Sequence, residues 1–177
     1  LLVRANVSIS RGVDVLPSYY LSAPVFLSST TESDYVVELV GEQDNLISSH
    51  PVKAYKIEDG EENTYDINEI IPVSAASVKQ LRIKFQGKPI AKRDIAQSNL
   101  LVLDASKIQD HLALNAGLPD VPRLVRYTED NGTTWTVLGI DLTADQMNFP
   151  IQQLPNSAIY EVIFADGYGS ASIKWSK

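Results

Sequence analysis

Apolar and polar residues alternate along much of this chain, and this period of two constrains the possible folds more than any other sequence feature. In the clearest example, the apolar residues Leu81, Ile83 and Phe85 alternate with Arg82, Lys84 and Gln86. In a β-strand this spacing places the apolar side chains on one face and the polar side chains on the other. The same template fits residues 35–40, 52–57, 124–127, 134–138 and 160–165. The sequence therefore predicts a protein built mainly from half-buried strands.

A hairpin is predicted over residues 81–95. Gly87 and Lys88 suit a two-residue type II′ turn, because glycine tolerates the positive φ of the first central position. Pro89 cannot donate a ladder hydrogen bond, and residues 91–94 break the alternation. The second arm is therefore expected to be an edge strand or a loop.

The spacing of the strands predicts two all-β modules. Short strands separated by Gly, Pro, Asn and Asp, often at intervals of about 8 to 12 residues, are typical of antiparallel β-sandwiches. A chain of 177 residues suits two small antiparallel β-sandwich modules, immunoglobulin-like or fibronectin-like, which we place at residues 1–104 and 105–177. A short helix over residues 104–117 is the alternative there, with Asp104 or Ser106 as N-cap and Gly117 as terminator.

The charge balance argues against nucleic acids and membranes as partners. The 15 Lys and Arg residues are outnumbered by 22 Asp and Glu residues, so a net charge of −7 repels phosphate backbones and anionic lipids. No apolar stretch has the roughly 20 residues that cross a bilayer, so no membrane insertion is expected. Without cysteine there is no disulfide framework, thiolate nucleophile or Cys-based zinc site. The start of the chain lacks a signal-peptide pattern, and we expect a fragment of a longer precursor.

Residues 128–135 carry the most specific motif. Thr128, Asp130, Gly132, Thr134 and Trp135 occupy the positions of the Asp-box, whose pattern is Ser or Thr, any, Asp, any, Gly, any, Thr, Trp. The segment resembles the Asp-boxes of sialidases and of many secreted β proteins. Its residue types suit a hairpin corner, because glycine can take positive φ, aspartate can accept hydrogen bonds from turn amides, and tryptophan offers a large apolar face. A single copy argues against a β-propeller and for a structural role.

Residues 121–177 as a whole resemble a fibronectin type III or related immunoglobulin-like module. The spacing of Leu154 and Tyr160 is similar to the tyrosine corner of such sandwiches, in which the Tyr hydroxyl bonds to nearby backbone. Tyr160 and the alternate residues after it would face inward, and a last strand would cover residues 170–175. The segment also resembles C-terminal accessory modules of secreted prokaryotic proteins. This resemblance implies an extracellular or cell-surface location and an accessory role.

Candidates for catalysis or metal binding are few. The two histidines, His50 in a predicted loop and His111, lie in no recognisable motif, and we expect ordinary surface or core residues. The acidic run at residues 58–62, with Asp66 nearby, is expected to be a solvated turn, and a Ca²⁺ site is the alternative. No catalytic residue, cofactor or metal site is therefore predicted.

Exposed aromatic residues are the candidates for sugar binding, because a ring offers a broad apolar face while Tyr and Trp keep a polar edge. The candidates are Tyr19, Tyr20, Tyr168 and Trp175. One of Tyr19 and Tyr20 is expected in the core, since adjacent strand residues point to opposite faces. Trp175 alternates with Lys174, as a packing residue would.

The sequence thus predicts a non-catalytic structural or interaction module of a larger exported or cell-surface protein. Its partners would be other domains of the parent protein and a surface protein or glycan. A carbohydrate-binding module of a secreted hydrolase is the alternative, and an enzyme comes third. A binding module predicts a row of exposed aromatic rings, whereas an enzyme predicts a deep pocket with convergent titratable groups.

Overall fold

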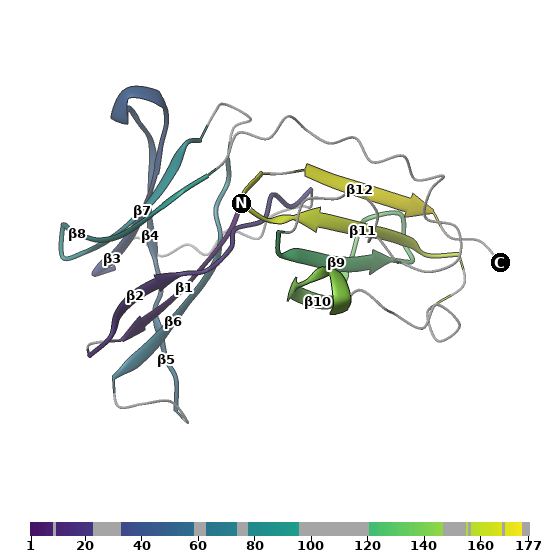
Figure 1. The fold of residues 1–177 in the computed structure, drawn as a ribbon, viewed down its shortest axis with the longest axis horizontal. Coiled ribbons are helices and arrows are strands. Elements are labelled where there is room, and N and C mark those ends of the chain that lie inside the picture. The colour runs from purple at the N-terminus through teal and green to yellow at the C-terminus, as the bar shows by residue number, and fades with distance from the viewer. Residues whose placement is uncertain are drawn as a thin grey trace. The chain divides into compact units, whose positions relative to one another are not determined.

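The computed structural model describes residues 1–8, 10–22, 33–58, 63–73, 78–95, 121–146, 155, 157–167 and 169–174. Over these residues twelve strands form three antiparallel sheets, joined by turns and short 3-10 helices (Figure 1). The prediction of an all-β protein is confirmed for this described part of the chain. Within it, no helix has the length and apolar character needed to span a bilayer. The alternative helix over residues 104–117 lies outside the described residues.

The chain divides into two compact units. The N-terminal unit consists of Leu1–Ser18 and Val25–Gln97, and the C-terminal unit consists of Tyr19–Pro24 and Ser98–Lys177. The main change of unit therefore comes a few residues before the predicted boundary at residue 104. Nothing in the sequence marks the short segment Tyr19–Pro24 as part of the C-terminal unit.

The N-terminal unit contains two four-stranded antiparallel sheets. The first has the order β2-β1-β6-β5, with bounds Gly12–Val15, Leu2–Ser8, Thr64–Ile70 and Tyr55–Lys56. The second has the order β4-β3-β7-β8, with bounds Leu46–Val52, Tyr35–Val40, Gln80–Phe85 and Lys88–Asp94. Along the chain, β1 and β2 belong to the first sheet, β3 and β4 to the second, β5 and β6 to the first, and β7 and β8 to the second. The central pair of the first sheet is β1 with β6, and the central pair of the second sheet is β3 with β7.

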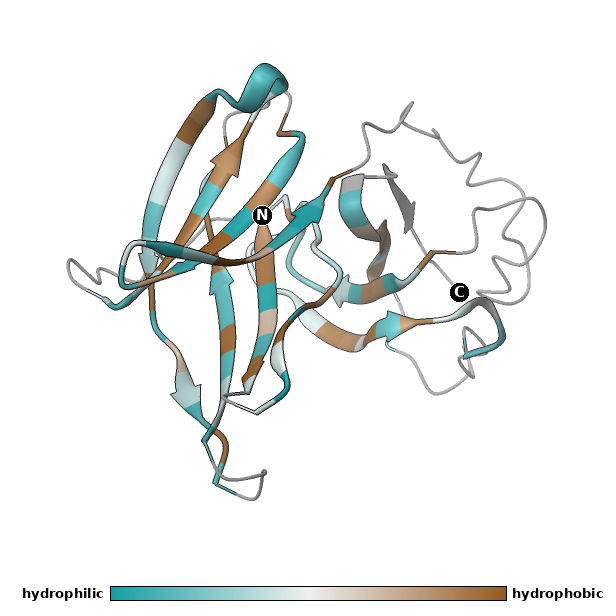
Figure 2. Cartoon of the chain, turned by 60° about the vertical axis from the view of Figure 1, so that its left-hand side comes forward, coloured by the Kyte–Doolittle hydropathy of each residue, from teal (hydrophilic) through white to brown (hydrophobic). Residues whose placement is uncertain are grey.

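One apolar core is shared by the two sheets of this unit. Alternate residues in the middle of three central strands are fully buried: Val3 and Ala5 on β1, Val37 and Leu39 on β3, and Leu81 and Ile83 on β7. On β3 the intervening Glu38 and the following Val40 are buried as well. Figure 2 shows the corresponding alternation of hydrophobic and hydrophilic residues along these strands. The period of two therefore specifies which face of each central strand is buried, and the two faces together form a two-layer core.

The hairpin of β7 and β8 forms, but its turn differs from the predicted one. Phe85 pairs with Lys88, so Gln86 and Gly87 are the two central residues. Their φ angles are 48° and 78°, and positive φ at both positions is the geometry of a type I′ turn. The type II′ prediction is wrong because the ladder extends to Lys88 and moves the turn back by one residue. The second arm is an edge strand, in agreement with the ladder defect expected at Pro89.

Residues 52–57 do not form one strand, in contrast to the prediction. Strand β4 ends at Val52, and the chain crosses at Lys53 and Ala54 to the other sheet, where Tyr55–Lys56 form β5. Val52 and Ala54 are apolar at alternate positions, whereas Tyr55 and Ile57 are apolar on the opposite phase, so the alternation shifts by one residue where the chain crosses. Such a shift reverses the faces of a strand but does not show which sheet the next residues join.

The C-terminal unit contains one described antiparallel sheet with the order β10-β9-β11-β12. The strands are Thr136–Leu142, Arg123–Thr128, Ile159–Phe164 and Gly169–Lys174. Tyr160, Val162 and Phe164 on β11 are buried, as predicted, and the intervening Glu161 and Ile163 are buried as well. A strand covered on both faces must give its buried carboxylate a polar partner. A second sheet of this unit, which a sandwich requires, is not among the described residues.

Candidate functional site

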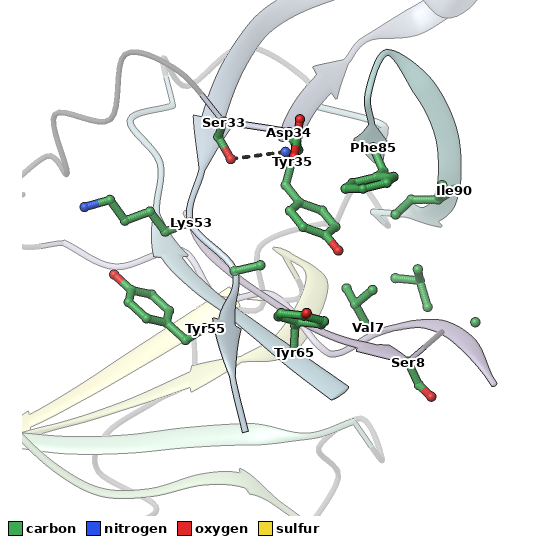
Figure 3. Close-up of a pocket in the computed structure, with 13 residues that line it drawn as sticks. Val7, Ser8, Ser33, Asp34, Tyr35, Lys53, Tyr55, Tyr65, Phe85 and Ile90 are labelled. Atoms are coloured by element: carbon green, nitrogen blue, oxygen red, sulfur yellow. Dashed lines mark hydrogen bonds between the residues drawn. The ribbon is translucent and has the colours of Figure 1, made fainter. Parts of the chain in front are cut away.

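A groove of about 760 Å³ opens between the two sheets of the N-terminal unit. Aromatic residues are prominent in its lining, with Tyr35 and Phe85 from the second sheet and Tyr55 and Tyr65 from the first (Figure 3). Its volume lies within the range of about 300 to 1,000 Å³ typical of small-molecule sites. The groove is therefore large enough to hold a ligand.

Strand register explains why the groove is aromatic. Tyr35 pairs with Phe85 on the second sheet, and Val7 pairs with both Val13 and Tyr65 on the first. Residues that pair directly across antiparallel strands share a face, so each set forms one row of the inner surface. The next row consists of fully buried residues, Ala5, Ile67, Val37 and Ile83. The groove thus continues the core, with large rings in place of closely packed aliphatic side chains.

Tyr35 occupies a central place among the rings. Its ring centroid lies 4.8 Å from that of Phe85, and the two planes are inclined by 42°. Figure 3 shows its hydroxyl directed toward the Tyr65 side of the groove. Burial raises the pKa of Tyr35, and the neighbouring Tyr65 and Asp34 raise it further. The phenol therefore stays protonated at neutral pH and can donate a hydrogen bond.

Polar residues surround these rings. Ser33 lies where β3 begins, and its hydroxyl accepts a hydrogen bond from the Tyr35 amide at 3.1 Å. Asp34 and Lys53 bring opposite charges to the lining. The side chain of Tyr55 is 56% exposed, and Figure 3 shows it beside Lys53, apart from the other rings. The groove consequently combines an apolar interior with polar groups near its opening.

Residues 128–135, which resemble an Asp-box, form the turn between β9 and β10. The Asp130 carboxylate accepts hydrogen bonds from the Thr134 amide at 2.8 Å and from the Thr134 and Thr128 hydroxyls, each at 2.7 Å. These bonds, with the Thr134 amide as the largest cause, lower the pKa of Asp130 to about 2. Gly132 has a φ of 92°, and a β-carbon there would lie 3.7 Å from the Trp135 ring. The acid is therefore engaged in holding the turn.

Trp135 connects this turn to a buried ion pair. The guanidinium carbon of Arg126 lies 4.0 Å from the centroid of the Trp135 ring. Arg126 Nε donates to Glu161 Oε2 at 2.6 Å, and the two side chains are only 3% and 7% exposed. The same guanidinium donates to the Ser22 carbonyl at 2.9 Å. Arg126 therefore joins β9, β11 and the segment Tyr19–Pro24 within the C-terminal unit.

The two residues singled out as a tyrosine corner are only partly described. The Tyr160 hydroxyl donates to the Pro155 carbonyl at 3.1 Å, which is a short-range bond to upstream backbone. The Tyr160 ring lies 5.8 Å from that of Tyr127 on the neighbouring strand. Leu154 lies outside the described residues. The hydroxyl bond holds the chain just before β11 against that strand.

The aromatic pair Tyr19 and Tyr20 divides between core and surface, as predicted. Tyr19 is fully buried, and its hydroxyl donates to Asp141 Oδ1 at 2.7 Å, whereas Tyr20 is 37% exposed. The other two sugar-binding candidates, Tyr168 and Trp175, lie outside the described side chains. Neither Tyr19 nor Tyr20 lines the groove.

His50 lies on β4 and not in a loop, so that part of the prediction is wrong. An edge strand can contain the following residue, Pro51, because an edge position need not donate a ladder hydrogen bond. The imidazole Nε2 is 2.9 Å from the Ser48 hydroxyl, and burial lowers the pKa of His50. His111 lies outside the described residues. His50 is not a lining residue of the groove.

The acidic run is described only at its edge. Glu58 lies at a turn and Asp66 lies on β6, whereas residues 59–62 are outside the described residues. In the described ranges no group of three or more His, Asp or Glu side chains could hold a metal ion. The solvated turn and the Ca²⁺ alternative both stay predictions.

The groove aromatics were missed as binding candidates. In the sequence, Tyr35, Tyr65 and Phe85 occupy alternating positions of strands and look like core residues. A usable signal was their place near strand ends, since Tyr35 begins β3, Phe85 ends β7 and Tyr65 is the second residue of β6. Aromatic residues at the ends of several strands can gather at one end of a sandwich, but only the register shows which of them do.

Comparisons with protein-family models, curated proteins and solved structures find no match to the chain. No residue role can therefore be transferred from a relative. The functional inference therefore depends on the chemistry of the groove and on the packing within each unit.

Proposed function

We propose that the chain is a non-catalytic interaction module of a larger exported or cell-surface protein, and that its N-terminal unit binds a ligand in the groove between its sheets. The observation that carries this proposal is the convergence of rings from both sheets on an open volume of about 760 Å³. A mainly apolar concavity with a few polar groups is typical of ligand sites.

The ionisable groups of the groove favour binding over catalysis. Among the described lining residues, Asp34 and Lys53 carry charge at neutral pH, and no histidine accompanies them. Nucleophilic catalysis needs a nucleophile within hydrogen-bond reach of a base. Ser48 and His50 make such a contact on β4, but neither residue lines the groove.

For the C-terminal unit we propose an immunoglobulin-like or fibronectin type III-like module that acts as a spacer or accessory part. Three observations support it: an antiparallel sheet, the Tyr160 hydroxyl bond to upstream backbone, and the Asp-box turn between β9 and β10. The proposed exported setting comes from the resemblance to accessory modules of secreted prokaryotic proteins.

A carbohydrate-binding module is the second candidate function. It is favoured by the hydroxyl groups on three of the four aromatic residues of the groove, Tyr35, Tyr55 and Tyr65. Such rings offer an apolar face and a polar edge in the same side chain.

A fragment screen by two-dimensional amide NMR of the whole chain tests the proposed function. We expect fragment hits to shift the amides around Tyr35, Tyr65 and Phe85, and the Tyr35→Ala variant to lose these shifts. The matched control is Tyr20→Ala, which removes an exposed ring of the other unit and should leave the shifts unchanged. Hits that cluster away from the groove would contradict the proposal. So would turnover of hydrolase substrates that is abolished by Asp34→Asn.

A further inference from the structure

The chemistry of the groove selects among ligand classes. Tyr35, Tyr65 and Phe85 offer apolar ring surfaces, and Figure 3 shows them gathered around one space. Within the described residues, the hydroxyls of Tyr35, Tyr55 and Tyr65 make no hydrogen bond to protein atoms. A ligand that covers the rings of Tyr35 and Tyr65 must therefore also satisfy their two phenol hydroxyls.

Two ligand classes fit poorly. A purely apolar ligand would remove the tyrosine hydroxyls from water without offering them hydrogen-bond partners, which is unfavourable. A strongly charged ligand would meet one acidic and one basic side chain, Asp34 and Lys53, whose opposite charges give no net attraction. The groove therefore suits a neutral ligand with apolar faces and many hydrogen-bonding groups.

We propose that the groove binds a neutral oligosaccharide. The C–H face of a sugar ring packs against Tyr35, Tyr65 and Phe85, and the sugar hydroxyls bond to the tyrosine hydroxyls and to Asp34. Tyr55, which is exposed beside Lys53, offers a further ring to a second sugar unit. The inference rests on the proposed function, because it names the ligand class of the same groove.

Isothermal titration calorimetry of the whole chain against three sets of probes tests this inference. The first set contains neutral oligosaccharides of hexose, pentose and N-acetylhexosamine units, the second contains sialyllactose and oligogalacturonates, and the third is a library of short peptides. We expect saturable binding to a member of the first set and none to the other two. Amide NMR of the complex should place the shifts at the groove.

Four variants separate the roles of ring and hydroxyl. Tyr35→Ala should weaken binding of the neutral sugar about tenfold or more, since it removes a ring surface and a hydroxyl together. Tyr35→Phe and Tyr65→Phe keep the rings and should each weaken it about two- to tenfold, as expected for one lost hydrogen bond. The Phe variants keep the test valid if Tyr35→Ala unfolds the unit. Tyr20→Ala is the control and should bind the sugar with the affinity of the unsubstituted chain.

The outcomes distinguish this inference from the proposed function. Peptide binding that Tyr35→Phe or Tyr35→Ala abolishes would overturn the sugar assignment but leave the groove as a ligand site. Preference for the acidic sugars, or sugar binding that the groove variants leave unchanged, would also overturn it. If no probe of any set shifts the groove amides, both the sugar assignment and the proposed site fail.

Discussion

Replacing Glu161 with leucine leaves the Arg126 guanidinium buried without its carboxylate, and we expect a strong loss of stability in the C-terminal unit. The two side chains are 3% and 7% exposed, so water cannot replace the lost partner easily. Removing one member of such a pair costs about 3 to 5 kcal/mol. Arg126→Met should cost a similar amount, because Glu161 then keeps only a 3.3 Å contact with the Ser22 hydroxyl.

The double variant R126M/E161L should be far more stable than the two single effects would suggest, because it buries no unpaired charge. It still loses the bond from the charged guanidinium to the Ser22 carbonyl, worth about 2 kcal/mol, and the contact of the guanidinium with Trp135, worth about 1 kcal/mol. A loss of about 3 kcal/mol against a summed loss of at least about 6 kcal/mol gives a coupling of about 3 kcal/mol or more.

Urea unfolding of the whole chain, followed by tryptophan fluorescence, measures this coupling. Both tryptophans, Trp135 and Trp175, belong to the C-terminal unit, so the signal reports that unit separately. Arg82→Met is the matched control, because it breaks the surface pair with Asp44 in the N-terminal unit and should leave the tryptophan transition in place. A coupling energy below about 0.5 kcal/mol, as independent sites show, would refute the reasoning.

Three further predictions concern single side chains. The pKa of Asp130 lies at about 2, below the 3.8 of an ordinary carboxyl, so its stabilising effect is present above about pH 4 and is lost as the pH falls toward 2. Asp130→Asn should flatten this acid dependence of the tryptophan-detected urea midpoint, and an unchanged pH profile would contradict it. Gly87→Ala should destabilise the N-terminal unit by about 1 kcal/mol in urea unfolding followed by circular dichroism, because the turn needs positive φ there, whereas Gln86→Gly should cost nothing or stabilise slightly. Tyr19→Phe should lower the stability of the C-terminal unit by about 1.5 to 2 kcal/mol in the tryptophan-detected titration, since it removes a 2.7 Å bond to Asp141, and a parental midpoint would argue against that role.

Strands that follow one sheet were predictable, and strands that change sheet were not. Residues 35–40 match β3 at both ends, since this apolar run, interrupted only by Glu38, stays within one sheet. Within residues 52–57 the alternation shifts by one residue at Tyr55, where the chain passes from β4 to β5. The order of apolar and polar residues indicates which side chains are buried, but it does not indicate which sheet buries them.

The candidate site shows the same limit. The turn at residues 128–135 could be predicted from the sequence, because Asp130 binds partners only two and four positions away. The groove could not, since Tyr35 and Tyr65 meet only through the packing of two sheets. Tyr20, which was chosen as an exposed aromatic candidate, does not line the groove.

By itself, the sequence determined the buried faces of regularly alternating strands such as β7, the approximate places of the turns and the local bonds of residues 128–134, because each depends on residues close together in the chain. Tertiary structure decided the groove, the partner of Glu161 and the place of the segment Tyr19–Pro24 in the C-terminal unit. These features depend on which strands pair and in which register. That choice is made by the summed burial of the whole core, to which each local segment contributes only a part.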